Sequence, residues 1–263
     1  MNPSANADTR VRNLVLLHGW GMNAAVWDGL PAALSAGLTQ HRIELPGHGE
    51  SAFGPPCDGG GPHALWAWAD ACLAAAPERA VWLGWSLGGL VALAAALRAP
   101  ERIQALILMT ATPRFVRAAD WTPAMPPEIL AQFHDGLLAD PAGTLSRFLA
   151  LQVRGSEHAR QALRTLRQEL SARPAPNPAA LRLGLDLLRD EDLRGPLPDL
   201  RPPSLWLFGD HDTLVPAAVA KRIEILLPKA RTGVIQGAAH APFISHPAET
   251  IEAISGLLQR NDA

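Results

Sequence analysis

Short, continuously apolar runs alternate along the chain with longer segments in which apolar residues recur every three or four positions. The short runs predict β-strands and the longer segments predict helices. Strands that are apolar along their whole length, separated by helices, are typical of a parallel sheet with helices on both faces. The sequence therefore predicts an α/β fold with a mostly parallel central sheet flanked by helices. The six predicted strands cover residues 13–19, 41–47, 80–85, 103–110, 203–210 and 230–237.

The interval between the fourth and fifth predicted strands, residues 111–203, contains no convincing strand. Three of its segments have helical periodicity with proline or glycine at their boundaries. These segments are residues 126–140, 141–155 and 157–172. We therefore predict a helical cap at residues 113–190, inserted into a core formed by residues 1–112 and 191–263.

Composition places this chain of 263 residues among globular proteins, with 48% hydrophobic and 18% charged residues. A net charge of −2 gives no overall match to nucleic acid. The sequence has no apolar run of the ~18 residues that a membrane span needs, and residues 1–10 lack the pattern of a secretory signal. Two cysteines, Cys57 and Cys72, are too few for a disulfide framework and are expected to be reduced thiols. We expect a cytoplasmic protein without nucleic-acid or membrane partners.

A serine stands among glycines where the third predicted strand meets a helical segment, in the stretch GWSLGG from Gly84 to Gly89. Gly84, Ser86 and Gly88 match the G-x-S-x-G pattern of a nucleophile elbow, a sharp turn that exposes the serine hydroxyl above a sheet. The pattern is short enough to occur by chance, and the alternative is an ordinary turn between a strand and a helix. The apolar strand before it and the helical pattern after it favour Ser86 as a nucleophile.

A serine hydroxyl becomes a good nucleophile only when a base accepts its proton and an acid orients that base. In this architecture the acid follows a late strand, and the histidine lies near the end of the chain. We expect His240, after the last predicted strand, to be the base, and His246 to have a structural role. Of the two aspartates after the fifth strand, we expect Asp212 to be the acid and Asp210 to hold the turn by hydrogen bonds to the backbone. His211, between them, is expected to be a solvated loop residue.

Acyl transfer also needs hydrogen-bond donors directed at the oxyanion. One candidate is the backbone N–H of Leu87, at the start of the helix after the elbow. The other is the backbone N–H of Trp20, in the loop after the first strand, and its indole is expected to form a pocket wall. His18, in the same loop, is expected to be a buried histidine that braces the loop.

The predicted cap is rich in arginine. Its residues 141–173 carry a net positive charge, whereas the whole chain has a net charge of −2. At ~100° per residue, Arg160, Arg164 and Arg167 form one helical stripe, with leucines on a neighbouring face. A solvated helix face is one interpretation of this stripe. The other is a docking surface for an acidic partner, where complementary charge steers the encounter. Next to Arg147, residues 148–152 offer an apolar surface that could face the serine from beneath the cap.

Several motifs extend beyond the elbow: LVLLHGWGMNAAVW, ELPGHGES, VWLGWSLGGLVA, RFLALQ, EHARQALR and AAHAPFISHPAE. Through them the chain resembles the pimeloyl-[acyl-carrier protein] methyl ester esterases of biotin synthesis, a family of α/β-hydrolases. The likeness runs from about Asn13 to the C-terminal helix. RFLALQ is its most informative part, because caps diverge widely among relatives.

The resemblance implies hydrolysis of the methyl ester at the far end of a pimeloyl chain carried on acyl carrier protein, with release of methanol. Ser86 would attack the ester carbonyl, His240 would transfer the proton, and Asp212 would orient the imidazole. The N–H groups of Trp20 and Leu87 would hold the oxyanion. No cofactor or metal is required for this chemistry.

The resemblance also implies a substrate site and a surface for the carrier protein. The substrate site would comprise Trp20, Ser86, Leu87, Phe148, Leu149, Ala150, Leu151, Gln152 and His240. The acidic acyl carrier protein would meet Arg147, Arg160 and Arg164. We expect the enzyme to be a monomer.

Three other functions are compatible with the pattern of residues. A general carboxylesterase for short acyl esters would use the same triad, with the arginines merely solvated. A hydrolase of carbon–carbon bonds would also use it. A non-catalytic ligand-binding member of the fold is a further alternative, which the intact triad disfavours.

Overall fold

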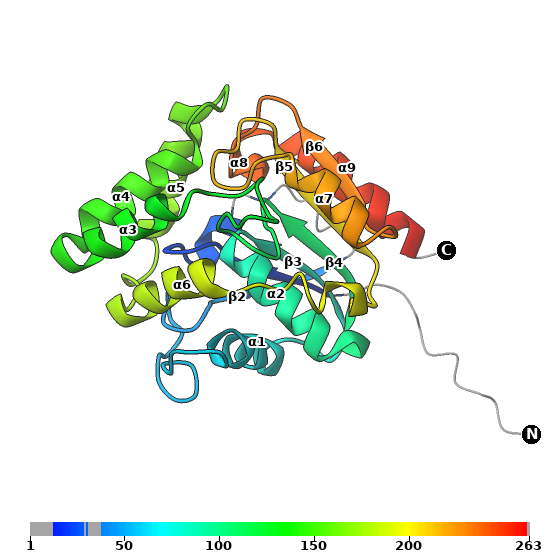
Figure 1. The fold of residues 1–263 in the computed structure, drawn as a ribbon, viewed down its shortest axis with the longest axis horizontal. Coiled ribbons are helices and arrows are strands. Elements are labelled where there is room, and N and C mark those ends of the chain that lie inside the picture. Colours follow the sequence, from blue (N-terminus) through cyan, green and yellow to red (C-terminus); the bar gives the residue numbers. More distant parts are fainter. Residues whose placement is uncertain (1–12, 29, 31–37, 262–263) are drawn as a thin grey trace, which may run out of the picture.

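The central sheet has six parallel strands in a computed structural model that describes residues 13–28, 30 and 38–261 (Figure 1). Their order in the sheet is β2-β1-β3-β4-β5-β6, and every neighbouring pair is parallel. The predicted α/β architecture is therefore confirmed. The strands are β1 (Asn13–Leu17), β2 (Thr39–Ile43), β3 (Ala80–Trp85), β4 (Ile103–Met109), β5 (Ser204–Gly209) and β6 (Arg231–Ile235).

The four central strands differ in burial from the two at the edges. β1, β3, β4 and β5 are buried along almost their whole length, whereas β2 and β6 bury only their last residue. The prediction that helices flank the sheet is confirmed, and edge strand β6 contacts both α7 and α9 although its side chains are less buried than those of the central strands. The largest error in a strand boundary also lies at an edge, because β2 ends at Ile43 rather than at residue 47.

The alternation of side chains along each strand divides the core into two clusters, one on each face of the sheet. On β1, Val15 and Leu17 join a cluster with α1, α2 and α7. Leu14 and Leu16 join the opposite cluster, with a short 3-10 helix η1, α8 and α9. These helices are α1 (Ala64–Ala75), α2 (Leu87–Arg98), α7 (Val219–Leu226), η1 (Ala24–Trp27), α8 (Pro242–Ser245) and α9 (Pro247–Asn261); the 3-10 turns η3 (Pro100–Arg102) and η4 (Leu197–Asp199) precede β4 and β5.

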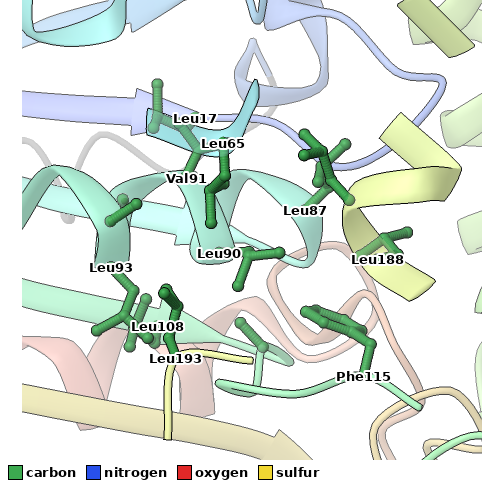
Figure 2. Close-up of a cluster of buried hydrophobic side chains, with 14 of the residues drawn as sticks. Leu17, Leu65, Leu87, Leu90, Val91, Leu93, Leu108, Phe115, Leu188 and Leu193 are labelled. Atoms are coloured by element: carbon green, nitrogen blue, oxygen red, sulfur yellow. The ribbon is translucent and has the colours of Figure 1, made fainter. Parts of the chain in front are cut away.

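Helix α2, which follows the serine, lies deep in the first cluster. Figure 2 shows Val91 of α2 beside Leu17 of β1 and Leu65 of α1, while Leu87 points toward α6, which carries Leu188. Every residue of α2 from Leu87 to Ala96 is buried. The element that positions the serine is therefore held by the sheet on one side and by helices on the other.

The predicted helical insertion between β4 and β5 is present. Its helices are α3 (Pro127–Ala139), α4 (Pro141–Gln152), α5 (Ala159–Ser171) and α6 (Pro178–Asp190). The sequence encodes two of their starts directly: Asp140 accepts a hydrogen bond from Gly143 N ahead of α4, and Asn177 accepts one from Ala179 N ahead of α6. In Figure 1, α3, α4 and α5 stack at one side of the sheet, and α6 lies between them and α2. The exact cap boundaries, 113 and 190, stay a prediction.

Residues 53–62 form turns and bends without a helix or strand, as the sequence predicts. Trp68 of α1 anchors this loop by donating a hydrogen bond from its indole N–H to the Cys57 carbonyl at 3.0 Å. Cys57 and Cys72 are both free and buried, and burial raises the pKa of Cys72 to about 12. Within the ranges that the structure describes, no helix has the length and apolarity needed to cross a membrane.

Candidate active site

The turn between β3 and α2 places Ser86 in a strained backbone conformation, with φ 55° and ψ −119°. Such conformations are rare for residues other than glycine and cluster at functional sites. Two glycines make the turn possible. A Cβ on Gly84 would lie 2.4 Å from the Gly88 carbonyl oxygen, and a Cβ on Gly88 would lie 2.4 Å from the His18 carbonyl oxygen. The G-x-S-x-G sequence therefore folds into the sharp turn of a nucleophile elbow.

His240 lies in hydrogen-bond contact with the serine, at 2.8 Å between Nε2 and Ser86 Oγ. Three bonds fix the backbone of His240. Its carbonyl accepts from the Trp85 indole at 2.7 Å and from the Thr110 hydroxyl at 2.8 Å, and its N–H donates to the Gln152 carbonyl at 2.9 Å. Trp85 of β3, Thr110 just after β4 and Gln152 at the end of α4 thus hold the backbone of His240 in place.

Asp212 completes the chain of hydrogen bonds, because its Oδ2 lies 2.7 Å from His240 Nδ1. Its other oxygen, Oδ1, accepts from the N–H groups of Leu214 at 2.8 Å and Val215 at 3.1 Å. Asp212 therefore also holds the turn, which was expected of Asp210. The Asp210 side chain is partly exposed, and its carboxylate lies 3.9 Å from the ring of His211.

All three side chains are almost inaccessible to solvent, with exposures of 3% for Ser86, 5% for Asp212 and 1% for His240. An ion pair or hydrogen bond is stronger in such surroundings than in water. The arrangement can therefore move a proton from Ser86 to His240 while Asp212 stabilises the resulting imidazolium.

The histidines without a predicted catalytic role lie where the sequence suggests. His18 is fully buried and braces its loop, because Nε2 accepts from Leu45 N at 3.1 Å. His211 is exposed and bonds the Gly155 carbonyl at 2.6 Å. His246 is buried at the boundary between α8 and α9.

His48 is a buried residue that the sequence reasoning missed. Its ring centre lies 5.2 Å from that of His18, and its Nδ1 lies 3.1 Å from the Pro46 carbonyl oxygen. Burial first, and then the neighbouring His18, lowers the pKa of His48 to about 3. The imidazole is therefore neutral at physiological pH.

The two expected oxyanion donors, Leu87 and Trp20, have backbone N–H groups that stay a prediction in this role. Leu87 is the first residue of α2, where a helix leaves its N–H groups without an intrahelical acceptor. Within the described part of the chain, neither Leu87 N nor Trp20 N has a hydrogen-bond acceptor. Both N–H groups therefore remain available to a ligand.

The Trp20 side chain joins the core to the cap. Its indole N–H donates to the Leu181 carbonyl on α6 at 2.8 Å. Its ring meets the ring of Phe148 on α4 edge-on, with centres 4.7 Å apart. The loop that carries Trp20 is thereby fixed against two cap helices.

The side chains of the expected substrate residues 148–152 lie on different sides of helix α4, because successive helical residues are ~100° apart. Phe148 is buried in the first core cluster, and Leu151 packs against it. Leu149 belongs to the second cluster, and Ala150 is exposed to solvent. The expectation that residues 148–152 together form one surface facing the serine is therefore too broad, and Ala150 is the clearest exception.

Gln152, at the end of α4, has a buried side chain whose Oε1 lacks a hydrogen-bond partner in the described part of the chain. Its carbonyl oxygen accepts from His240 N. A buried amide oxygen without a partner is costly, and a ligand that brought a donor to it would be favoured.

The expected carrier-binding arginines are exposed on α4 and α5. Arg147 donates to the Thr144 hydroxyl at 2.7 Å and lies 4.0 Å from the Asp140 carboxylate. Neither Arg160 nor Arg164 forms an ion pair within the described residues, and Leu166 on the other face of α5 is fully buried. The structure thus has the predicted arrangement of leucines inside and arginines outside.

Comparisons with known proteins agree with this geometry. A family model described as alpha/beta hydrolase fold matches residues 12–247. A pimeloyl-[acyl-carrier protein] methyl ester esterase from Citrobacter koseri is 46% identical over 94% of this chain and 94% of its own length. An esterase of the same name from Edwardsiella ictaluri is 47% identical over 90% of this chain and 89% of its own. Among solved structures, an esterase from Exiguobacterium antarcticum has a TM-score of 0.82 at 21% identity, covering 95% of this chain and 92% of that one, which shows the fold alone.

Proposed function

The chain belongs to the alpha/beta hydrolases and, within them, to the pimeloyl-[acyl-carrier protein] methyl ester esterases, and we propose that it carries out their reaction in biotin synthesis. The substrate would be the methyl ester of a pimeloyl chain on acyl carrier protein, and the products the free carboxylate and methanol. The observation that carries this proposal is the hydrogen-bonded chain from Ser86 through His240 to Asp212, in a protein 46% identical to such an esterase.

The first half of the reaction forms an acyl-enzyme. Ser86 Oγ attacks the ester carbonyl carbon while His240 Nε2 takes the hydroxyl proton. The carboxylate of Asp212 keeps Nδ1 protonated and stabilises the imidazolium. When the tetrahedral intermediate collapses, the bond to the methoxy oxygen breaks, and the proton on Nε2 passes to that oxygen to give methanol.

The second half restores the enzyme. His240 takes a proton from a water molecule, whose oxygen attacks the acyl-serine carbonyl carbon. Collapse of this second intermediate breaks the bond to Ser86 Oγ and returns the proton to the serine. One ester and one water thus give one carboxylic acid and one methanol, without an oxidant, a metal or a cofactor.

In both intermediates the negative oxygen would be held by the N–H groups of Leu87 and Trp20. Donors fixed at the place where charge develops commonly make one of the largest contributions to acyl transfer. The Leu87 donor comes from the rigid start of α2, and the Trp20 donor from the loop that Leu181 and Phe148 hold. Neither N–H group donates to an acceptor within the described residues, so neither would have to break a hydrogen bond to bind the oxyanion.

We assign the surface of α4 and α5 that carries Arg147, Arg160 and Arg164 to the acyl carrier protein. The arginines of α5 are uncompensated among the described residues, while the chain as a whole has a net charge of −2. This local excess of positive charge favours an acidic partner. Phe148 and Gln152, on the inner side of the same cap, would contact the acyl chain. We retain the predictions of a cytoplasmic location and a monomer.

The substrate assignment is tested by comparing kcat/KM for carrier-bound pimeloyl methyl ester and for a carrier-free methyl ester. In the double variant Arg160→Glu, Arg164→Glu, we expect a loss of at least ~10-fold on the carrier-bound ester at low salt and less than ~2-fold on the free ester. Arg201→Glu is the control, since this exposed arginine precedes β5 at the opposite end of the strands. Equal rates on both esters, unaffected by the variants, would identify a general carboxylesterase instead.

A further inference from the structure

Two histidines and a glutamate meet on the side of the molecule where the cap joins the C-terminal part of the core. Glu157 and His158 lie in the connection between α4 and α5, and His246 lies between α8 and α9. One potential ligand atom from each residue lies within 4.8 Å of the other two. The rings of His158 and His246 have centres 5.3 Å apart. The catalytic mechanism uses none of these side chains.

The hydrogen bonds of His246 determine which of its nitrogens can bind a ligand. The Ser245 hydroxyl oxygen lies 3.2 Å from the Ala241 carbonyl oxygen and 2.9 Å from His246 Nδ1, so when its proton goes to the carbonyl, the oxygen accepts from Nδ1–H. In the neutral ring this leaves the lone pair on Nε2. Metal-binding histidines are commonly oriented in this way by a bond to the other ring nitrogen. His246 is also buried, which fixes the ring.

Gly237 provides the space in which Glu157 and His246 approach each other. A Cβ on this glycine would lie 2.9 Å from the carboxyl carbon of Glu157 and 3.1 Å from Nε2 of His246. Its φ of +75° also favours glycine. Glu157 N donates to the Gly237 carbonyl at 3.2 Å, which holds the cap connection against this position. Both ligand groups therefore converge above a residue that has no side chain.

The charge of Glu157 has no counter-ion in the described part of the chain, where no basic side chain forms an ion pair with its carboxylate. Imidazole nitrogens and a carboxylate oxygen form a donor set that zinc and neighbouring transition metals prefer. Magnesium and calcium prefer oxygen ligands throughout. The donor set thus selects a transition-metal dication over the two common alkaline-earth ions.

We propose that Glu157, His158 and His246 bind a zinc ion, or a similar divalent transition metal, with solvent at the fourth position. Tetrahedral zinc with bonds of about 2.0–2.1 Å brings its ligand atoms to within about 3.4 Å of one another. Glu157 and His158 are exposed and can rotate to close that distance, while His246 supplies the fixed anchor. Ester hydrolysis needs no metal, so this ion would be structural.

Bound metal would join the cap to the boundary between α8 and α9, one short helix after the catalytic histidine. Hydrogen bonds already join the two parts here, from His240 N to the Gln152 carbonyl and between His211 and the Gly155 carbonyl. Three metal bonds would add a far stronger connection just before α5, the helix with the proposed carrier-binding arginines. Because the metal binds the folded state only, it would stabilise the protein.

Calorimetric titration of the chelator-treated full chain with ZnCl₂ tests the proposal. At neutral pH we expect one equivalent of zinc to bind with a Kd of about 10 μM or tighter and to raise Tm. His158→Ala and Glu157→Gln should each raise Kd at least ~10-fold and remove the rise in Tm. Both side chains are exposed, so the metal-free variants should keep the native Tm. His63→Ala, which removes an exposed histidine at the start of α1, is the matched control and should bind as the native chain does.

Two results would overturn the site. One is no saturable binding of zinc up to about 1 mM. The other is unchanged affinity and stoichiometry in His158→Ala and Glu157→Gln, which would place the metal elsewhere. A titration with MgCl₂ checks the metal class, because binding of magnesium as tight as that of zinc would contradict a site built on imidazoles. Ester hydrolysis by the metal-free chain is measured in parallel, so that loss of the metal site and loss of the proposed function are distinguishable.

Discussion

At the scale of single residues, the two oxygens of the Asp212 carboxylate have separate partners. Oδ2 meets the catalytic imidazole at 2.7 Å, and Oδ1 accepts from Leu214 N and Val215 N. An asparagine at this position can keep the bonds of Oδ1, but it presents an amide in place of Oδ2. Orientation of the histidine and stability of the turn can therefore be separated by one substitution.

We expect Asp212→Asn to lower kcat about 10³- to 10⁴-fold, because the amide favours the wrong tautomer of His240. Tm should change by only a few degrees, because the turn keeps its acceptor. Asp210→Asn is the matched control, and should retain nearly native kcat because this carboxylate lies against His211 rather than against the catalytic histidine. Steady-state hydrolysis of a short soluble ester gives kcat for the native chain and both variants. A similar loss of kcat in both variants would contradict Asp212 as the catalytic acid.

His48 makes the stability of the fold depend on pH. Its pKa is about 3 in the folded protein, whereas an unfolded histidine titrates near 6.5. Between these values the unfolded state binds a proton that the folded state excludes, so the free energy of unfolding falls as the pH falls from 6.5 toward 3. A single such group contributes a slope of about 1.4 kcal/mol per pH unit.

We therefore expect His48→Asn to flatten the loss of stability between pH 6 and 4 relative to the native chain. Denaturant unfolding at several pH values measures the slope. His63→Ala, which removes an exposed histidine, should retain the native slope. If His48→Asn kept the full native slope, the acid sensitivity would come from other groups.

Residue-level prediction from sequence was successful where chain order and neighbouring elements restrict the choice. Ser86, His240 and Asp212 are joined by hydrogen bonds as expected. The role of the Asp212 Oδ1 atom could not be predicted, because either aspartate can form hydrogen bonds within the turn. His48 was missed because its burial depends on the meeting of two separate loops, which no local pattern encodes.

At the scale of elements, the elbow depends on close approach between backbones. A Cβ on Gly88 would meet the carbonyl oxygens of His18 and Leu17 at 2.4 and 2.5 Å. These atoms belong to β1 and the loop after it, so they cannot move aside as a flexible side chain would. The same contact seats α2 against the loop that carries Trp20.

Gly88→Ala is therefore expected to cost at least about 3 kcal/mol of unfolding free energy or to prevent folding. Gly60→Ala provides the control, because a Cβ there has open space and no positive φ opposes it. Its effect should stay within about 0.5 kcal/mol. Chemical denaturation compares the two, and a Gly88→Ala protein of native stability would show that the turn relaxes easily.

The elements themselves follow closely from the sequence. β3 has its predicted limits, and three of the four cap helices, α3, α4 and α5, coincide with the periodic segments that predict them, whereas no segment was named for α6. The β2 edge strand was placed least accurately, because a half-exposed strand lacks the continuous apolar run that marks a buried one. The prediction that residues 148–152 all face the serine was also too broad, because five consecutive residues of a helix cannot lie on one side of it.

At the scale of the whole molecule, the cap and the core divide the proposed function between them. The core holds the triad and the proposed oxyanion donor Leu87, while the cap contacts this site and carries the arginines. Trp20 bridges the two parts through Leu181 and Phe148. Net charge alone would not indicate this division, because a total of −2 conceals the uncompensated arginines of α5.

The central claim combines a nucleophile with a substrate, and one measurement tests both: release of methanol from pimeloyl-[acyl-carrier protein] methyl ester by the native chain and by Ser86→Ala. We predict multiple turnovers with the native chain and a rate at least ~10³-fold lower with the variant. Equal release by the two proteins would contradict Ser86 as the nucleophile. No release by the native chain, alongside rapid hydrolysis of small esters, would contradict the carrier-bound substrate.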